Sequence, residues 1–321
     1  MVDMSAPTDL LDAARSGDAA AFERLVGPLR EELVAHCYRM LGSRHDAEDA
    51  VQEALVRAWR SIGGLDDRGF VRAWLYKIAT NRCLTVLEKL RRRELPFEVL
   101  PAAPDTDICW LEPYPDPSPE ASYLAREGVE LAFVAALQRL SALQRAVLVL
   151  REVLGFSAAE VAEQLDTSTA SVNSALQRAR KVVGTTSISQ HSVLNELGSA
   201  GVEDIVSRWM TAWQAGDVDA IVAMLADQAR YSMPPRLEWY TGPAAIRAFL
   251  SNGPLRSQWR FLPTTANGQL AFGTYLWDET TNVYAPGGLD VLTIRGRHVT
   301  EIVAFLSADL EDFGLPARLT G

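Results

Sequence analysis

Side chains that can read the edges of DNA bases are concentrated in one stretch of the chain, residues 157–181. Asn and Gln can pair with adenine edges and Arg with guanine, and hydroxyl groups can bond to bases or phosphates. The stretch carries such groups at Thr169, Ser171, Asn173, Ser174, Gln177, Arg178 and Lys181. This composition predicts a segment that contacts duplex DNA.

Two short helices joined by a tight turn are predicted to position these side chains, over residues 157–165 and 169–183. The apolar residues expected to be buried are Val161, Ala162, Leu165, Val172 and Ala175. Asp166 stands where the turn usually has glycine, and Asp adopts the left-handed conformation more readily than most residues. The pattern predicts a helix-turn-helix whose second helix enters the major groove. The alternative is a helical hairpin that only packs.

A second candidate for nucleic-acid contact lies upstream, in residues 68–93. Unstacked bases are held by aromatic stacking and cationic contacts, at about 1–3 kcal/mol per base. The segment has eight basic residues and one acidic residue, although the whole chain carries a net charge of −10. Nucleic acid responds to the local potential rather than to the total charge. Trp74 has the spacing of a core residue, so we interpret it as a packing residue.

Residues 46–59 form a predicted amphipathic helix with an acidic face. Asp49, Gln52 and Glu53 share this face by their spacing. The opposite face is predicted to be buried and consists of Ala50, Val51, Ala54, Leu55 and Ala58. The residues alone favour a solvated acidic face, and docking on a basic partner is the alternative.

These motifs, taken in order, resemble the extracytoplasmic-function (ECF) sigma factors of bacterial RNA polymerase. The resemblance rests on DAEDAVQEALVRAW (46–59), FVRAWLYKIATNRC (70–83) and the helix-turn-helix, and it covers residues 10–183. It implies that the chain binds the polymerase core, at the β′ clamp and the β flap, and recognises the −10 and −35 promoter elements. The implied polymerase contacts at the clamp are Asp49, Gln52 and Glu53.

The resemblance also assigns DNA contacts. The residues implied to hold the melted −10 strand are Arg68, Tyr76, Lys77, Asn81 and Arg82, and the helix-turn-helix would read the −35 element. Two positions depart from the family pattern: Thr85 replaces a usual Asp, and Asn173 replaces a frequent Lys or Arg.

The segment 96–120 is predicted to be a linker, because it contains seven prolines, six acidic residues and no basic residue. One interpretation is a flexible spacer. The other follows from the resemblance, since linkers between sigma domains run in the polymerase cleft, where an acidic chain can mimic RNA.

From residue 201 onward the pattern becomes α+β. We predict helices at 202–215, 218–225 and 244–252, and strands at 230–233, 259–266, 269–277, 288–295 and 299–306. Helices followed by antiparallel strands favour helices packed on one curved sheet. The segments WMTAWQAGDVDAIVAMLADQARYSMPP and WYTGPAAIRAFL resemble SnoaL-like members of the NTF2-like superfamily. The whole chain therefore resembles the sigma factors that carry a fused SnoaL-like C-terminal domain.

The C-terminal domain is predicted to regulate the sigma domains in cis. Alternation places Tyr231, Arg260, Tyr275, Asp290 and His298 inside its cup, but no acid–base pair stands at a fixed spacing, so we predict no enzymatic activity. A small ligand in the cup is the alternative. The predicted interdomain contact is the loop 233–242, through Pro234, Pro235, Trp239 and Tyr240. The alternative is that these residues form the lip of the cup.

Composition limits the remaining possibilities. Hydrophobic residues make up 48% of the chain, enough for packed cores. Three separated cysteines indicate neither disulfides nor a thiolate zinc site, and we expect a cytoplasmic protein without signal peptide or membrane span. No metal or cofactor is implied.

The predicted organisation is multidomain: two all-α domains at 8–95 and 121–184, linkers at 96–120 and 185–200, and an α+β domain at 201–321. Two rival functions remain at this point. One is a one-component, ligand-responsive DNA-binding regulator, and the other is a SnoaL-type cyclase or isomerase with a DNA-binding appendage.

Overall fold

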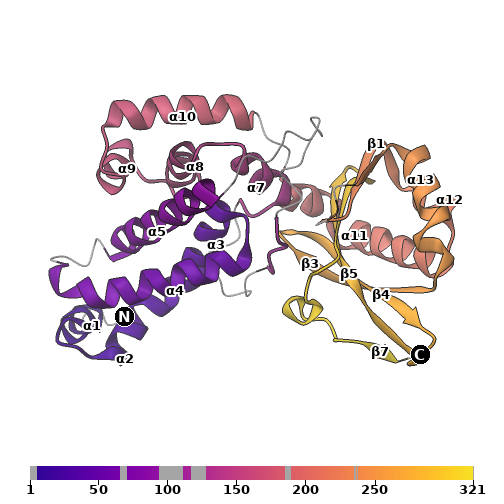
Figure 1. Ribbon diagram of the computed structural model, residues 1–321, viewed down its shortest axis with the longest axis horizontal. Coiled ribbons are helices and arrows are strands. Elements are labelled where there is room, and N and C mark those ends of the chain that lie inside the picture. The colour runs from indigo at the N-terminus through magenta and orange to yellow at the C-terminus, as the bar shows by residue number, and fades with distance from the viewer. Residues whose placement is uncertain are drawn as a thin grey trace. The chain divides into compact units, whose positions relative to one another are not determined.

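The computed structural model describes residues 6–65, 71–93, 111–116, 128–184, 189–234, 236 and 238–320. These residues form two compact units, which Figure 1 shows as a helical part and a part built around a sheet. Unit 1 combines residues 1–103 with 117–185, and unit 2 combines 104–116 with 186–321. Unit 2 therefore takes up part of the segment predicted to be a free linker.

The first half of unit 1 is a set of helices with short connections. Its helices are α1 (Ala6–Arg15), α2 (Ala19–Val26), α3 (Arg30–Leu41), α4 (Arg44–Ser61) and α5 (Val71–Arg93), with 3-10 turns η1 (Gly27–Leu29) and η2 (Ile62–Gly64). α2 and α3 are two helices rather than one, because the chain is interrupted at Gly27 and Pro28. Proline has no N–H to donate and its ring clashes with the preceding turn, so α2 ends there and α3 starts afresh.

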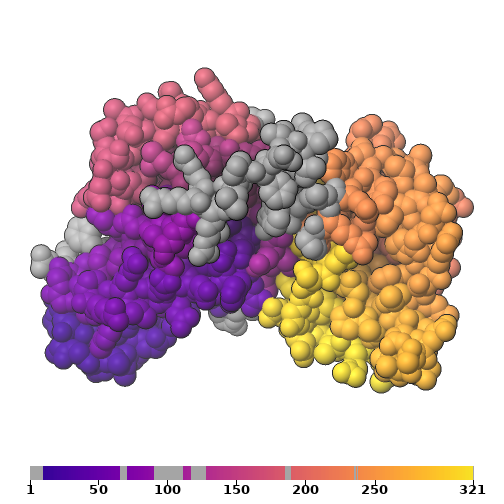
Figure 2. Space-filling model, viewed as in Figure 1, coloured from indigo at the N-terminus to yellow at the C-terminus, as the bar shows by residue number. Residues whose placement is uncertain are grey.

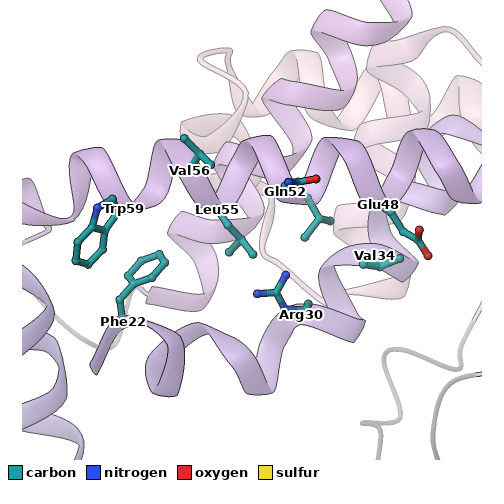
Figure 3. Close-up of a pocket in the computed structure, with 9 residues that line it drawn as sticks. Phe22, Arg30, Val34, Glu48, Gln52, Leu55, Val56 and Trp59 are labelled. Carbon is teal, nitrogen blue, oxygen red and sulfur yellow. The ribbon is translucent and has the colours of Figure 1, made fainter. Parts of the chain in front are cut away.

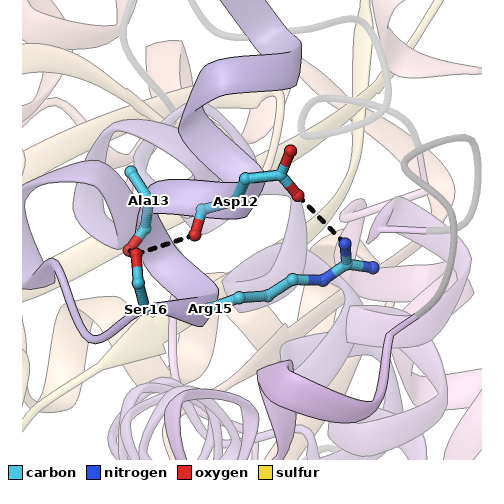
Figure 4. Close-up of polar contacts among 4 residues, drawn as sticks. All are labelled: Asp12, Ala13, Arg15 and Ser16. Carbon is cyan, nitrogen blue, oxygen red and sulfur yellow. Dashed lines mark hydrogen bonds and ion pairs between the residues drawn. The ribbon is translucent and has the colours of Figure 1, made fainter.

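Local hydrogen bonds fix the ends of these helices. The Asp18 carboxylate caps α2 by accepting from the amides of Ala20 and Ala21. At the end of α1, the Ser16 hydroxyl is 2.9 Å from the carbonyl oxygens of both Asp12 and Ala13 (Figure 4). These contacts satisfy backbone groups that a helix end leaves without intrahelical partners.

Small residues on α4 allow close packing against α3 and α5. The buried residues of α4 are Ala47, Ala50, Val51, Ala54, Leu55 and Ala58. The predicted buried face of this helix is thereby confirmed.

The second half of unit 1 contains the predicted helix-turn-helix. Its elements are α7 (Leu131–Gln138), α8 (Ala142–Leu148), the π-helical turn η5 (Val149–Val153), α9 (Ala158–Gln164) and α10 (Thr169–Val183). Ser141 and Ser157 each begin a helix with a capping box, together with Gln144 and Glu160. The bounds predicted for the second helix of the motif agree with α10.

Unit 2 is an α+β fold. Its elements are α11 (Gln190–Gln214), α12 (Val218–Ala223), β1 (Leu225–Ser232), β2 (Trp239–Thr241), α13 (Pro243–Asn252), the 3-10 turn η6 (Pro254–Arg256), β3 (Trp259–Ala266), β4 (Gln269–Asp278), β5 (Val283–Arg295), β6 (His298–Phe305), the 3-10 turn η7 (Leu310–Phe313) and β7 (Leu319–Thr320). The strand order is β2-β1-β6-β5-β4-β3, and β7 pairs with β5. β1 and β6 are parallel, and the other pairs are antiparallel.

Two element predictions in unit 2 need correction. The linker expected at 185–200 is partly helical, because α11 begins at Gln190 and continues across a kink at Gly198. The Gln190 side chain bonds to the backbone of Ile294 as a neighbouring strand would. Its amide nitrogen donates to the Ile294 carbonyl at 3.0 Å, and its oxygen accepts from the Ile294 amide at 2.8 Å. The loop expected at 233–242 contains strand β2, which pairs with β1.

Stacked aromatic rings form much of the core of unit 2. Trp213 stacks on Phe261 at 4.7 Å between ring centres, and Trp209 lies 6.3 Å from Phe272. These pairs join α11 to strands β3 and β4. No helix in the described part of the chain is long and apolar enough to cross a membrane.

Candidate functional site

The predicted acidic face is present on the outside of α4. Asp49, Gln52 and Glu53 are all exposed, while the opposite face is buried. The Ser43 hydroxyl starts this helix by accepting from the Asp46 amide at 3.1 Å. The face is therefore exposed, and its Glu53 carboxylate also pairs with Arg82.

An open groove lies beside this face, between α4 and the α2–α3 segment (Figure 3). Its lining residues are Phe22, Arg30, Val34, Glu48, Val51, Gln52, Leu55, Val56 and Trp59. Val56 is 46% exposed, so the groove presents an apolar side chain to solvent. Gln52 thus connects the polar face to an apolar groove, a combination typical of protein–protein contacts.

Tyr76, which was predicted to contact the −10 strand, is not accessible to DNA. Its side chain is fully buried, and its hydroxyl donates to Glu32 at 3.1 Å. The ring packs edge-on against Phe156, at 5.8 Å between centres, and the Arg72 guanidinium lies over both rings. Burial raises the pKa of Tyr76, with the Glu32 charge adding to the effect. A base cannot stack on Tyr76 in this arrangement.

His36 extends the same buried cluster. Its Nε2 lies 2.8 Å from the Thr80 hydroxyl, and its ring packs edge-on against Tyr76. Burial, with the nearby Arg39 charge, lowers the pKa of His36 to about 3. The histidine is therefore neutral and structural.

The other residues predicted for the −10 strand have mixed placements. Lys77 Nζ lies 3.1 Å from the Glu163 carbonyl oxygen and 3.6 Å from the Asp166 carboxylate, both in the helix-turn-helix. Arg82 pairs with Glu53 at 2.6 Å. Asn81 is half-buried, and Arg68 lies outside the described residues. The two cations are therefore engaged by protein groups in this arrangement.

The helix-turn-helix presents its predicted reading face to solvent. Thr169, Asn173, Ser174, Gln177, Arg178 and Lys181 are exposed, and Ser171 is half-buried. Asp166 has φ +49°, the left-handed conformation expected in the turn. The Ser168 hydroxyl caps α10 by accepting from the Ser171 amide at 3.1 Å. α10 runs along the outside of unit 1 (Figures 1 and 2), as a reading helix requires.

Residues 111–116 of the predicted linker are held by unit 2. Pro115 forms a β-bridge with Ala266, and the adjoining residues bond to the β3–β4 turn. Leu111 and Tyr114 are buried. The flexible-spacer interpretation is therefore wrong for this short segment.

Three of the five predicted polar residues, Tyr231, Tyr275 and Asp290, are buried in unit 2. Burial raises the pKa of Asp290 to about 7 and that of Tyr231 well above its usual value. Arg260 and His298 are exposed instead. Tyr275 follows a β-bulge and donates to the Pro316 carbonyl at 2.7 Å, so strict alternation fails there.

The predicted interdomain residues have other surroundings. Tyr240 stacks on Phe249 at 4.2 Å, within the core of its own domain. Trp239 is half-buried in β2, Pro234 is buried, and Pro235 lies outside the described residues. The prediction of an aromatic loop was wrong here, because these aromatic residues belong to a strand.

Sequence reasoning missed the residues that hold the 111–116 segment. The signal was present, since Asn267-Gly268 between two alternating apolar segments is typical of a tight hairpin turn. Both residues have positive φ, +57° and +66°. Among the described residues, no group of three or more His, Cys, Asp or Glu could hold a metal ion.

Comparison with known families agrees with this organisation. Residues 25–93 match the family model for Sigma-70 region 2, residues 130–183 match Sigma-70 region 4, and residues 206–303 match a SnoaL-like domain. The two helical modules thus define a sigma factor, the class of protein that directs RNA polymerase to promoters.

Individual relatives narrow the class further. The chain is 42% identical to the ECF RNA polymerase sigma factor SigG of Mycobacterium tuberculosis, over 95% of this chain and 86% of that protein. The crystal structure of the ECF sigma factor SigJ from the same species matches with a TM-score of 0.62 and 26% identity, covering 94% of this chain and all of that one. The chain belongs to the ECF sigma factor family, with a C-terminal SnoaL-like domain, and the sequence prediction is confirmed.

Proposed function

We propose that this sigma factor docks on the polymerase β′ clamp and β flap, reads the −35 element with α10, handles the −10 strand near α5, and is controlled in cis by its SnoaL-like domain. The observation that carries the proposal is the composition of unit 2. It contains both the SnoaL-like fold and part of the connection between regions 2 and 4. A domain that holds this connection can influence how the two promoter-reading regions are used.

The exposed face of α4 is the proposed clamp contact. Its carboxylates would steer and orient a basic partner surface, and the adjoining groove would receive apolar side chains. Asp49→Arg combined with Glu53→Arg should abolish pull-down of core polymerase while helicity is kept. The matched control makes the same charge change in the SnoaL-like domain, with Glu203→Arg and Glu238→Arg. Unchanged binding by the α4 variant would contradict the assignment.

Control in cis is tested by removing the SnoaL-like domain. A chain ending at Gly184 should bind core polymerase but differ severalfold from the full chain in run-off transcription. Equal transcription by both chains would contradict cis control.

A binding role for the cup is a second candidate, favoured by buried polar atoms without a hydrogen-bond partner in the protein. These atoms are Asp290 Oδ2, Trp209 Nε1 and Trp213 Nε1. Phe272 is directly opposite Asp290 across the β4–β5 pair, and Trp209 stacks on Phe272. Asp290 and the Trp209 ring are therefore both neighbours of Phe272.

The two indole N–H groups are donors, and the Asp290 carboxyl donates when protonated, so together they suit a flat apolar ligand with one carbonyl oxygen, which is bound rather than converted. Titration with 2-acetonaphthone should quench tryptophan fluorescence more strongly than titration with naphthalene, which lacks the carbonyl. Asp290→Leu should remove the difference between the two probes. Equal quenching by both probes in the unaltered protein would contradict a polar recognition site.

A further inference from the structure

The hairpin turn between β5 and β6 carries the basic sequence Arg-Gly-Arg-His, residues 295–298. All four residues are exposed, while Ile294 and Val299 on either side are buried. Arg295 stands directly opposite His298 where the strands pair, so only two residues connect the strands. Residues 295–298, called here the arginine turn, are therefore a short basic tip on a buried sheet.

The surrounding backbone fixes the place of this tip. Gly296 has φ +58°, a conformation that glycine adopts at low cost in a tight turn. The side chain of Gln190, the first residue of α11, bonds to both backbone groups of Ile294 just before the turn. The arginines therefore project from a two-residue connection between paired strands, beside the start of α11.

Arg208, on α11, adds a third cation to this surface. One carboxylate oxygen of Asp204 lies 3.4 Å from the Arg297 guanidinium and 3.3 Å from that of Arg208, so the two arginines share it. The side chains of Arg297 and Arg208 are 63% and 48% exposed. With Arg295, three arginines stand against one aspartate, which leaves a local charge of +2.

Other acidic groups nearby do not cancel this charge. Glu301, on the strand after the turn, pairs with Arg230 at 2.9 Å. Glu203 lines a separate groove together with Pro263, and Arg208 does not line that groove. A polyanion responds to the local potential rather than to the net charge of −10 on the whole chain. The arginine turn is therefore a positive site on an acidic protein.

The covalent chain ties the arginine turn closely to the end of α10. Gly184 ends α10, and Gln190 begins α11 six residues later. An extended chain covers at most about 3.6 Å per residue, so these two residues lie within about 22 Å of each other in every conformation. One base pair rises about 3.4 Å, so this length corresponds to about six base pairs. DNA held by α10 is therefore within reach of the arginine turn.

We propose that the arginine turn, together with Arg208, binds phosphates of the duplex beside the −35 element while α10 occupies its major groove. The inference rests on the proposed reading of the −35 element by α10, and it adds a DNA contact made by the SnoaL-like domain. Arginine binds phosphate through paired hydrogen bonds, and such contacts position a protein on DNA without reading its sequence. The domain should thus raise promoter affinity without changing promoter choice.

Salt dependence tests the proposal in the full chain. Arg295→Ala with Arg297→Ala should remove about two phosphate contacts. Each contact changes affinity for a duplex by about 3.5-fold between 50 and 200 mM salt. The loss of affinity over this range should therefore be about tenfold smaller in the variant, as measured by fluorescence anisotropy with a labelled promoter duplex. An unchanged salt dependence would overturn the proposal.

Two further variants separate local charge from structure and from total charge. Arg295→Lys with Arg297→Lys keeps both charges and should keep most of the salt dependence, because lysine also binds phosphate. Arg247→Ala with Arg256→Ala removes two solvent-accessible arginines elsewhere in the same domain and should have little effect. An equal effect of this control and of the arginine-turn variant would overturn the proposal.

Asp204→Asn provides a change in the opposite direction. It removes the carboxylate that Arg208 and Arg297 share, so the local charge rises from +2 to +3. Affinity for the promoter duplex should rise severalfold at 50 mM salt, and this gain should disappear when Arg208 and Arg297 are also replaced by alanine. Unchanged or weaker binding by Asp204→Asn would contradict the proposed surface.

The length of the connection predicts where on the DNA the contact falls. A duplex that extends about ten base pairs beyond the −35 element on each side should bind more tightly than a duplex that ends at the element. The unaltered chain should gain severalfold more affinity from this extension than Arg295→Ala with Arg297→Ala. Equal gains would overturn the proposal.

Arg178→Ala distinguishes failure of this contact from failure of −35 reading by α10. If Arg178→Ala weakens duplex binding and the arginine-turn variant does not, only the phosphate contact fails. If neither variant weakens binding, the proposed reading by α10 fails as well. Pull-down of core polymerase should be unaffected by the arginine-turn variant. A loss of polymerase binding with unchanged DNA affinity would assign the surface to a protein partner and overturn the proposal.

Discussion

The carboxyl group of Asp290 is enclosed in the SnoaL-like domain, where burial raises its pKa to about 7. An unfolded Asp has a pKa of about 3.9. Between these values the unfolded chain ionises while the folded chain keeps the proton. The free energy of unfolding therefore falls as pH rises from about 4 to about 7, by on the order of 4 kcal/mol, and is insensitive to this group above that range.

Asp290→Asn should remove this dependence, because an amide does not titrate. The variant should match the unaltered chain near pH 4 and be more stable at pH 7. Urea unfolding of the full chain at both pH values, followed by tryptophan fluorescence, measures the difference. Asp204→Asn, at a partly exposed ion pair, is the control and should keep the pH dependence. A pH dependence unchanged by Asp290→Asn would show that the group is not the cause.

Arg178 is the residue through which base reading by α10 can be tested. If it pairs with a guanine, Arg178→Ala should cost about 1–3 kcal/mol of binding and relax preference at one base pair. Lys181→Ala, further along the helix, should weaken binding uniformly and lower its salt dependence. Affinities for duplexes with single base changes, at two salt concentrations, separate these outcomes. A uniform loss for Arg178→Ala would make it a phosphate contact.

The exposure of a residue was predictable where it follows from helix periodicity alone. Asn173, Gln177 and Arg178 belong to this group, since α10 has one buried and one exposed face. Tyr76 does not, because the residue that buries its ring, Phe156, is 80 positions away in the sequence. A local pattern carries no information about such a distant neighbour.

At the scale of elements, the predicted ends of a helix agree with the structure where local capping residues define those ends. α10 starts after the capping Ser168 and ends at Gly184, whose φ is +70°. β2 and the start of α11 were not predictable in the same way. Their partners are residues of β1 and Ile294, so non-local pairing decides their structure.

The Ser168 cap gives a prediction at this scale. Ser168→Ala removes the acceptor for the Ser171 amide and should cost about 1 kcal/mol of stability in region 4. Binding to a −35 duplex should weaken as the first turn of α10 frays. Hydrogen exchange of the Ser171 and Val172 amides, with Ser207→Ala as the control, measures the local effect. Unchanged exchange would mean that other contacts fix the start of α10.

At the scale of the whole molecule, regions 2 and 4 are in contact within unit 1, which no local pattern indicated. Lys77 bonds to the Glu163 carbonyl and pairs with Asp166, while Phe156 packs on Tyr76. Two promoter elements some 25 base pairs apart span about 85 Å of duplex, so two touching regions cannot read both. We therefore expect the regions to separate before promoter binding.

We therefore expect Lys77 to make two different contacts. It contacts region 4 while regions 2 and 4 touch (the closed arrangement), and it contacts DNA once they separate (the open arrangement). Lys77→Ala and Asp166→Asn should both loosen the closed arrangement, and Asn keeps the left-handed turn residue. The effect should be modest, since both side chains are partly exposed and surface ion pairs contribute at most about 1 kcal/mol. Spin labels at Arg57→Cys and Val182→Cys, in a Cys109→Ala chain, should report a broader distance distribution for both variants.

Binding to single-stranded DNA separates the two uses of this lysine. Lys77→Ala should weaken binding to a −10 oligonucleotide, because a cationic backbone contact is lost. Asp166→Asn should bind the oligonucleotide as well as the unaltered chain or better, because it frees Lys77 without removing it. Fluorescence anisotropy at two salt concentrations provides the measurement. If Asp166→Asn weakened binding as much as Lys77→Ala, the effect would come from the closed arrangement itself, and Lys77 would have no direct role on the −10 strand.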